Sequence, residues 1–125
     1  MKIRGYIFSY VNPDTDGVCS SIAYSFLKRR MIGDIFKPVV FGIINNETKF
    51  VLKHFRVDKP ELIAGIPDSK AIILLDTHHT KQLPDNMPSK NVIEIIDHHP
   101  TGNIDAFSGA IIQNEQVGAV ATLIT

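Results

Sequence analysis

The sequence predicts an α/β fold with a doubly wound, mostly parallel sheet and helices on both faces. Three observations predict it: strand-like and helix-like segments alternate, the central strand candidates are continuous apolar runs, and three strand candidates are followed by acidic residues. Continuous apolar runs are typical of parallel strands buried on both faces. Regular alternation of strands and helices favours crossovers that return to one sheet. With 125 residues, the chain has the length of one domain with a single core.

Each element follows from its local residue pattern. Residues 3–10 are rich in β-branched and aromatic residues, which favours a strand, and the turn-forming sequence NPDTDG ends it. Residues 18–31 place apolar side chains at helical spacing and are followed by Gly33 as a stop. Either Asp14 or Asp16 is a candidate cap for that helix. The remaining expected elements are strand 37–43, helix 47–55, strands 70–75, 91–96 and 110–113, and helix 117–124.

Charge and cysteine content narrow the classes of function. The formal net charge is zero, so no basic surface argues for nucleic acid as a partner. No apolar run approaches the roughly 20 residues that a membrane span needs. Cys19 is the only cysteine, which excludes an internal disulfide and favours the cytoplasm. We expect Cys19 to face the core and His54 to lie on the surface.

Acidic residues and histidines follow three of the predicted strands, in the sequences YVNPDTD, ILLDTHH and EIIDHH. Ligands bind outside the carboxyl ends of parallel strands, so these three loops should converge. The loops supply four aspartates and four histidines: Asp14, Asp16, Asp76, Asp97, His78, His79, His98 and His99. Mixed carboxylate and imidazole ligands suit Mn, Fe, Co or Zn. A carboxylate that bridges two such ions is a feature of two-metal hydrolases.

A metal site is not the only interpretation of these residues. An aspartate at a strand end often caps the following helix, which applies to Asp14 and Asp16 taken singly. A lone histidine pair is more often a polar feature of a loop than a metal ligand. Asp97 is also a candidate for orienting a neighbouring histidine without touching a metal. The coincidence of three acidic strand ends, two of them followed by His-His, favours the metal site.

These motifs resemble those of the DHH superfamily of phosphoesterases, and within it the N-terminal domain of the manganese-dependent family II inorganic pyrophosphatases. The similarity lies in NPDTDGVCSSIAYSFL, FGIINNETKFVLKHF, IILLD, IEIIDHH and NEQVGAVATLI, in that order over essentially the whole chain. It implies hydrolysis of a phosphoanhydride or phosphodiester bond in a small phosphate-containing substrate. It also implies two divalent ions, with Mn²⁺ as the first candidate and Co²⁺, Mg²⁺ or Zn²⁺ as alternatives.

The resemblance implies a role for each acidic strand end. Asp14 would bind the first ion, and Asp16 would bind the second together with His98. Asp76 would bridge both ions and take part in catalysis.

The same resemblance implies a catalytic and substrate-binding role for His99, which would donate a hydrogen bond to the phosphate. His78 is a second substrate-binding candidate, and Tyr10, His78 and Asp97 are candidates for metal binding or for support of the ligands. Tyr10 stands where the family usually places a histidine ligand of the first ion. A phenol with an ordinary pKa of about 10 is a poor ligand. We therefore expect weak binding of the first ion unless His78 or a water substitutes.

Some features depart from the pyrophosphatase pattern. The Thr-His-His that follows Asp76, together with Gly17, leans toward the DHH phosphodiesterases, and Pro100 stands where the family often has a basic residue. The resemblance also implies a further aspartate ligand and a second, substrate-binding domain after residue 125. We therefore expect residues 1–125 to be a DHH phosphoesterase domain that is incomplete at its C-terminal end.

Two further interpretations come from other classes of function. One is a degenerate domain that binds metal or nucleotide for regulation without catalysis, and Tyr10 motivates it. The other is an interaction module, in which the apolar C-terminal sequence VGAVATLIT pairs with a second copy or another partner.

Overall fold

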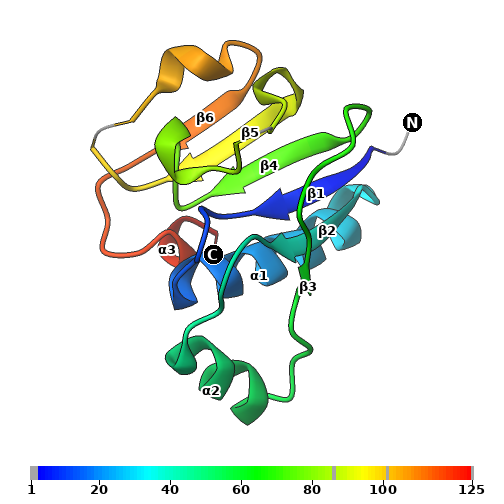
Figure 1. Cartoon of the computed structure of the whole chain (residues 1–125), viewed down its shortest axis with the longest axis vertical. Coiled ribbons are helices and arrows are strands. Elements are labelled where there is room, and N and C mark those ends of the chain that lie inside the picture. The colour runs from blue at the N-terminus through cyan, green and yellow to red at the C-terminus, as the bar shows by residue number, and fades with distance from the viewer. Residues whose placement is uncertain (1–2, 86, 101, 125) are drawn as a thin grey trace.

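The computed structural model describes residues 3–85, 87–100 and 102–124. In these residues, six strands form one sheet in the order β3-β2-β1-β4-β5-β6, and each neighbouring pair is parallel. The strands are β1 (Arg4–Phe8), β2 (Ile35–Val40), β3 (Glu61–Leu62), β4 (Ala71–Leu75), β5 (Val92–Asp97) and β6 (Ile111–Asn114). The predicted α/β, doubly wound fold is confirmed. The direction of winding reverses between β1 and β4, which lie side by side (Figure 1).

The two faces of the sheet are covered by different kinds of helix. The described helices are α1 (Thr15–Ile32), α2 (Asn46–His54), α3 (Ala121–Ile124) and the 3-10 helices η1 (Thr80–Gln82), η2 (Ser89–Asn91) and η3 (Ile104–Phe107). Figure 1 shows α1 and α3 on one side of the sheet and the turns that follow β5 on the other. The predicted cover on both faces is therefore present, with 3-10 turns on the second face.

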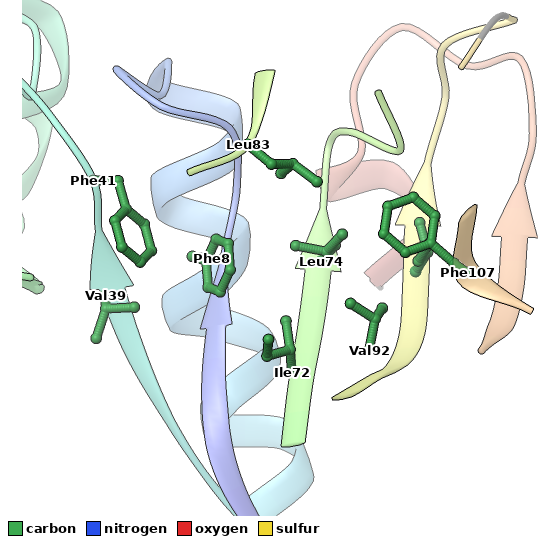
Figure 2. Packing of buried hydrophobic residues seen from close by; sticks show 9 residues of the cluster. Phe8, Val39, Phe41, Ile72, Leu74, Leu83, Val92 and Phe107 are labelled. Atoms are coloured by element: carbon green, nitrogen blue, oxygen red, sulfur yellow. The ribbon is translucent and has the colours of Figure 1, made fainter. Parts of the chain in front are cut away.

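Side chains alternate between the two faces along each central strand. On β1, Phe8 packs on the face covered by the 3-10 turns, and Ile7 packs on the α1 face. This alternation is the period of two that a strand imposes on its side chains. Figure 2 shows the first of these clusters, with α1 behind the strands. Its buried members are Phe8, Val39, Phe41, Ile72, Leu74, Leu83, Val92, Ile95 and Phe107.

Local capping sets the limits of the helices. Asp14 Oδ1 accepts a hydrogen bond of 2.8 Å from the Gly17 amide, so Asp14, of the two candidates, is the residue that caps α1. Gly33 ends the helix with φ 77°, a left-handed conformation that a glycine adopts without a steric penalty. Asn45 caps α2 in the same manner, through the Thr48 amide at 2.8 Å.

Two departures from the expected elements have clear causes. Strand β3 has two residues and pairs with Val39 and Val40 of β2, so it is too short to produce a periodic signal. The helix expected at 117–124 is confined to Ala121–Ile124, because backbone groups of the preceding residues bond to side chains elsewhere in the fold.

Two placements made from sequence agree with the structure. Cys19 is half-buried and packs against the cluster of Val18, Val40, Ile44 and Leu52. His54 is exposed at the end of α2, where it stacks on Phe50. Among the described helices, none is long and apolar enough to cross a membrane.

Gly5 lies close against the neighbouring strand β4 and gives a test of the sheet packing. A Cβ atom at Gly5 would lie 2.1 Å from the Ala71 carbonyl oxygen, whereas one at Gly65 would meet nothing within 4 Å. Overpacking of this kind typically costs about 1–3 kcal/mol. Gly5→Ala should therefore lose roughly 2 kcal/mol or more of unfolding free energy in urea, and Gly65→Ala should change it by less than about 0.5 kcal/mol. Equal stability of the two variants would contradict the packing described.

Candidate metal centre

The three acidic strand ends come together because β1, β4 and β5 are consecutive in the sheet. The loop after β1 carries Asp14, and the first turn of α1 carries Asp16. Asp76 directly follows β4, and His98 directly follows β5. This edge contains the point at which the winding of the sheet reverses, the place where open α/β sheets bind ligands.

Asp76 is the most deeply placed carboxyl group of the candidate set. Its residue is only 1% exposed, and its φ of 66° is left-handed, a conformation that aspartate tolerates better than most residues. Its amide donates to the Ile96 carbonyl at 2.9 Å, which continues the pairing of β4 with β5. Burial, with the nearby charges of Asp14 and Asp16, raises the pKa of Asp76 to about 9. Asp76 therefore holds a proton at neutral pH when no cation is bound.

His98 has one ring nitrogen bound to the backbone and the other facing carboxylates. Nδ1 lies 2.8 Å from the Val117 carbonyl oxygen, which can only accept, so Nδ1 carries the hydrogen. Nε2 lies 2.8 Å from Asp76 Oδ1 and 3.9 Å from Asp16 Oδ2. In the neutral ring, Nε2 is an acceptor and needs a proton or a cation between it and a carboxylate oxygen. An imidazole nitrogen that faces carboxylates belongs to a donor set that fits a transition-metal ion. Among the described residues, a group whose ligand atoms all lie within 4.8 Å of one another consists of Asp76, Asp97, His98 and His99.

Asp16 is held by the backbone at the far end of the chain. Its Oδ2 accepts from the Val120 amide at 2.8 Å and its Oδ1 from the Ala121 amide at 3.0 Å. Ser20 Oγ lies 3.3 Å from Oδ1. Each carboxylate oxygen has two acceptor sites, so Oδ1, which has two donors, is fully engaged and Oδ2, which has one, keeps a free acceptor site. Asp16 is therefore held in one orientation while its carboxylate can still accept a further contact.

Tyr10 lies beside Asp14 in this centre. Burial, followed by the charges of Asp14 and Asp76, raises the pKa of the Tyr10 phenol far above its ordinary value. The Asp14 carboxylate beside the phenol therefore favours the protonated form of Tyr10. A protonated phenol beside Asp14 competes with a cation for that carboxylate, and the weak first-ion site stays a prediction.

Asp97 lies at the centre of a buried hydrogen-bond network and is itself fully buried. Its Oδ1 accepts from the amides of His98 at 2.7 Å and His99 at 3.2 Å, and lies 2.7 Å from His99 Nδ1. Its Oδ2 bonds to Nδ1 of His78. With both oxygens engaged in this way, Asp97 is better suited to holding its neighbours than to binding a metal.

The other histidines take different positions. The His99 side chain is 47% exposed, its Nδ1 is held by Asp97, and its ring lies 4.3 Å from that of His98. His78 is 1% exposed and lies behind Asp97, against the backbone of Gly102. These contacts favour support by His78 over ligation. His79 Nδ1 is a buried polar atom without a hydrogen-bond partner in the described part of the chain.

The strand-end pattern predicted four ligands, and their role as ligands stays a prediction. It did not predict the contacts that hold two of them. Asp14, Asp16, Asp76 and His98 meet at one edge of the sheet, as the strand-end pattern predicts. The contacts made by Val117, Val120 and Ala121 carried no signal in composition or periodicity.

Comparison with known proteins agrees with this geometry. Residues 4–125 match the DHH family, N-terminal domain. The chain belongs to the DHH family. The resemblance to the DHH superfamily is thereby confirmed.

Relatives of this DHH domain include named enzymes. It is 38% identical over 122 residues to a probable manganese-dependent inorganic pyrophosphatase of Oceanobacillus iheyensis, covering 98% of this chain and 39% of that protein. It is 39% identical over 119 residues to a manganese-dependent inorganic pyrophosphatase of Methanothrix thermoacetophila, covering 95% of this chain and 38% of that protein. The DHH domain thus spans about two fifths of the length of these relatives.

Two solved structures share the fold of the DHH domain. A Methanococcus jannaschii protein described as a candidate family II inorganic pyrophosphatase superposes with a TM-score of 0.78 at 35% identity, covering 98% of this chain and 37% of that one. An exopolyphosphatase-related protein of Bacteroides fragilis gives a TM-score of 0.67 at 20% identity, with the same coverage of each chain. The second likeness shows the fold alone.

The protonated state of Asp76 predicts a pH dependence of stability. Between its ordinary pKa near 4 and about 9, the folded metal-free protein holds a proton on Asp76 that the unfolded chain releases. This contribution is complete below the ordinary pKa and is lost as the pH rises through the folded pKa. Stability should therefore fall with rising pH across that window, by at most about 1.4 kcal/mol per pH unit.

Asp76→Asn removes this dependence because asparagine does not titrate and also tolerates a left-handed backbone. Urea unfolding of the chelator-treated proteins, from about pH 5 to about pH 8, measures both slopes. The variant should show the flatter profile. Parallel profiles for the variant and the wild type would refute the assignment of the proton to Asp76.

Proposed function

We propose that the chain is the metal-binding domain of a phosphohydrolase that cleaves a phosphoanhydride bond, with inorganic pyrophosphate as the first substrate candidate. One observation carries the proposal: His98 Nε2 lies 2.8 Å from buried Asp76 and 3.9 Å from Asp16. These donors surround a point that needs a positive charge. The names of the Oceanobacillus and Methanothrix relatives support the reaction and the metal.

The proposed ligands serve two divalent ions. Asp14 would hold the first ion, Asp16 and His98 would hold the second, and Asp76 would contribute to both. Mn²⁺ is the first candidate because carboxylates dominate the set, and Co²⁺, Mg²⁺ and Zn²⁺ are alternatives. When bound, such ions supply Lewis-acid stabilisation of phosphoryl oxygens and activate a water as the nucleophile.

The protein's own groups orient the ligands and the substrate. His98 presents Nε2 because its Nδ1 is bonded to Val117. His99 is the proposed substrate-binding residue, since Asp97 holds its Nδ1 and the other edge of the ring is open to solvent. Asp97 and His78 act as support, and Asp76 exchanges its proton for a cation.

We further propose that residues 1–125 form one domain of a longer protein and that a second, substrate-binding domain completes the site. The share of the relatives that this chain covers, 37–39%, supports this arrangement. The formal net charge of zero supports it as well, because cleavage of a polyanion needs positive charge that this domain does not supply in excess.

The proposal places the protein in the cytoplasm, with a small phosphate-containing molecule as its substrate. A homodimer or another partner at the apolar C-terminal end has less support. Leu123 and Ile124 already pack against the buried cluster on the α1 face, so part of that apolar surface is used within the domain.

A second candidate function is metal binding without catalysis, in a regulatory role. The observation that favours it is Tyr10, whose phenol stays protonated beside Asp14. When Tyr10 engages the Asp14 carboxylate, the first ion loses a ligand. The centre then favours binding of one ion over two.

Hydrolysis assays test the leading proposal. The natural protein with Mn²⁺ should release phosphate from pyrophosphate, and Asp76→Asn should lower the rate at least about 100-fold, since even residues that only orient metal ligands cost 10- to 100-fold. Asp58→Asn, an exposed carboxylate outside the centre, is the matched control and should keep full activity. Wild-type protein that hydrolyses neither pyrophosphate nor other phosphoanhydrides with any of the four metals would rule the proposal out.

Tyr10→His separates the two candidate functions. The variant replaces the phenol hydroxyl with an imidazole, which can bind a metal ion. Tyr10→His should therefore bind two Mn²⁺ ions, whereas the wild type should bind the ion at Asp14 weakly. Turnover should rise in the variant. Calorimetric titration gives the stoichiometry. Tyr10→Phe removes the competing hydroxyl without adding a ligand, so it should bind the ion at Asp14 more weakly than Tyr10→His does. An unchanged stoichiometry in Tyr10→His would show that Tyr10 does not limit the site.

A further inference from the structure

The residues between β6 and α3 form a segment that returns from the edge of the sheet to the metal centre. We call residues 117–121, which are the end of this connection and the first residue of α3, the return segment. It follows β6, and a hydrogen bond of 3.2 Å from the Glu115 amide to the Asp97 carbonyl ties the chain just before it to the end of β5. Figure 1 shows that α3, which begins at Ala121, lies beside the first turns of α1. The segment therefore connects two of the three strand-end loops.

We propose that the return segment is the positioning element of the metal centre, setting the ring tautomer of His98 and the orientation of Asp16 through backbone contacts. This inference rests on the proposed function, because it concerns how the ligands of that centre are held. It assigns to the segment a role that none of its side chains indicates.

The contact with His98 sets which nitrogen is available. A neutral imidazole carries one hydrogen, and its location depends on the partner of each ring nitrogen. The Val117 carbonyl, 2.8 Å from Nδ1, accepts that hydrogen and leaves Nε2 with a free electron pair. Nε2 faces Asp76, so the free pair points to the place where the carboxylates converge.

The contact with Asp16 is made by two consecutive amides. The Val120 and Ala121 amides donate to different oxygens of the carboxylate, which fixes both the position and the rotation of the group. These partners are 104 and 105 residues from Asp16 in sequence, so the contact exists only when the sheet and the return segment are both formed. The same carboxylate is 3.9 Å from His98 Nε2.

Val120 anchors the return segment to the core. Its side chain is fully buried in the cluster on the α1 face, where its neighbours are Ile7, Phe36, Ile73, Leu75 and Ile96. The amide that binds Asp16 belongs to the same residue. The packing of the Val120 side chain thereby fixes the amide that orients Asp16. A change that loosens this packing should also make the position of the Asp16 carboxylate less fixed.

A matched pair of valines tests this role. Val120→Ala and Val92→Ala make the same chemical change at sites that are 0% and 2% exposed, but Val92 lies in the cluster on the opposite face. In the natural protein, Val120→Ala should weaken Zn²⁺ or Mn²⁺ binding about 10- to 100-fold, the usual cost of losing support for a ligand. Val92→Ala should leave the dissociation constant within about 2-fold, because its cluster does not contact the return segment's anchor.

Two measurements keep the inference testable if Val120→Ala folds poorly or the proposed function fails. Nitrogen chemical shifts of the metal-free protein report the His98 tautomer: wild type should hold the hydrogen on Nδ1, and Val120→Ala should populate both tautomers. In wild type, Zn²⁺ should slow hydrogen exchange of the Val120 and Ala121 amides at least about 10-fold more than exchange of the Ile63 amide.

The outcomes separate the two claims. Equal loss of metal affinity in Val120→Ala and Val92→Ala, or no loss in either, would overturn the positioning role while leaving the proposed function standing. Absence of metal binding by wild type would overturn the proposed function. In that case, a His98 tautomer fixed in wild type and mixed in Val120→Ala would still support the positioning role, and identical tautomers in both proteins would overturn it.

Discussion

Asp76 has almost no access to water, yet it lies 2.8 Å from a ring nitrogen with a free electron pair and close to the charges of Asp14 and Asp16. The negative charge of a buried carboxylate is normally compensated by a cation or removed by a proton. In the metal-free domain the proton fills that role. The rest of the centre is arranged around this need for positive charge, and the chemistry that we propose depends on exchanging the proton for a metal ion.

The fold creates this situation by placing β1, β4 and β5 next to one another where the winding of the sheet reverses. Aliphatic side chains on both faces exclude water below the strand ends, and the polar residues begin where the strands stop. Asp97 holds the turn that carries His98 and His99. The return segment fixes His98 and Asp16 from the other side. The rigidity of the centre thus comes from buried backbone and side-chain contacts, and the metal ligands themselves stay available.

Local patterns made the fold and the four central residues predictable. An apolar run that ends in aspartate indicates a parallel strand, and the aspartate marks the edge of the sheet where ligands bind. Both signals come from residues that are adjacent in sequence. The return segment could not be predicted, because its backbone groups bond to a side chain more than 100 residues away. The same bonds explain why the helix expected at 117–124 begins only at Ala121. Asp97 was predicted as a possible support residue, but the number of its partners depends on tertiary structure.

Proton release on metal binding is the most direct test of this account. Calorimetric titration of the natural protein with Mn²⁺, near neutral pH and in buffers with different ionisation enthalpies, gives the number of protons released per ion. Because Asp76 has a pKa of about 9, metal binding should displace about one proton from this carboxyl group. The same titration of Asp76→Asn should release none from this site. Tight binding by wild type without proton release would contradict the central claim.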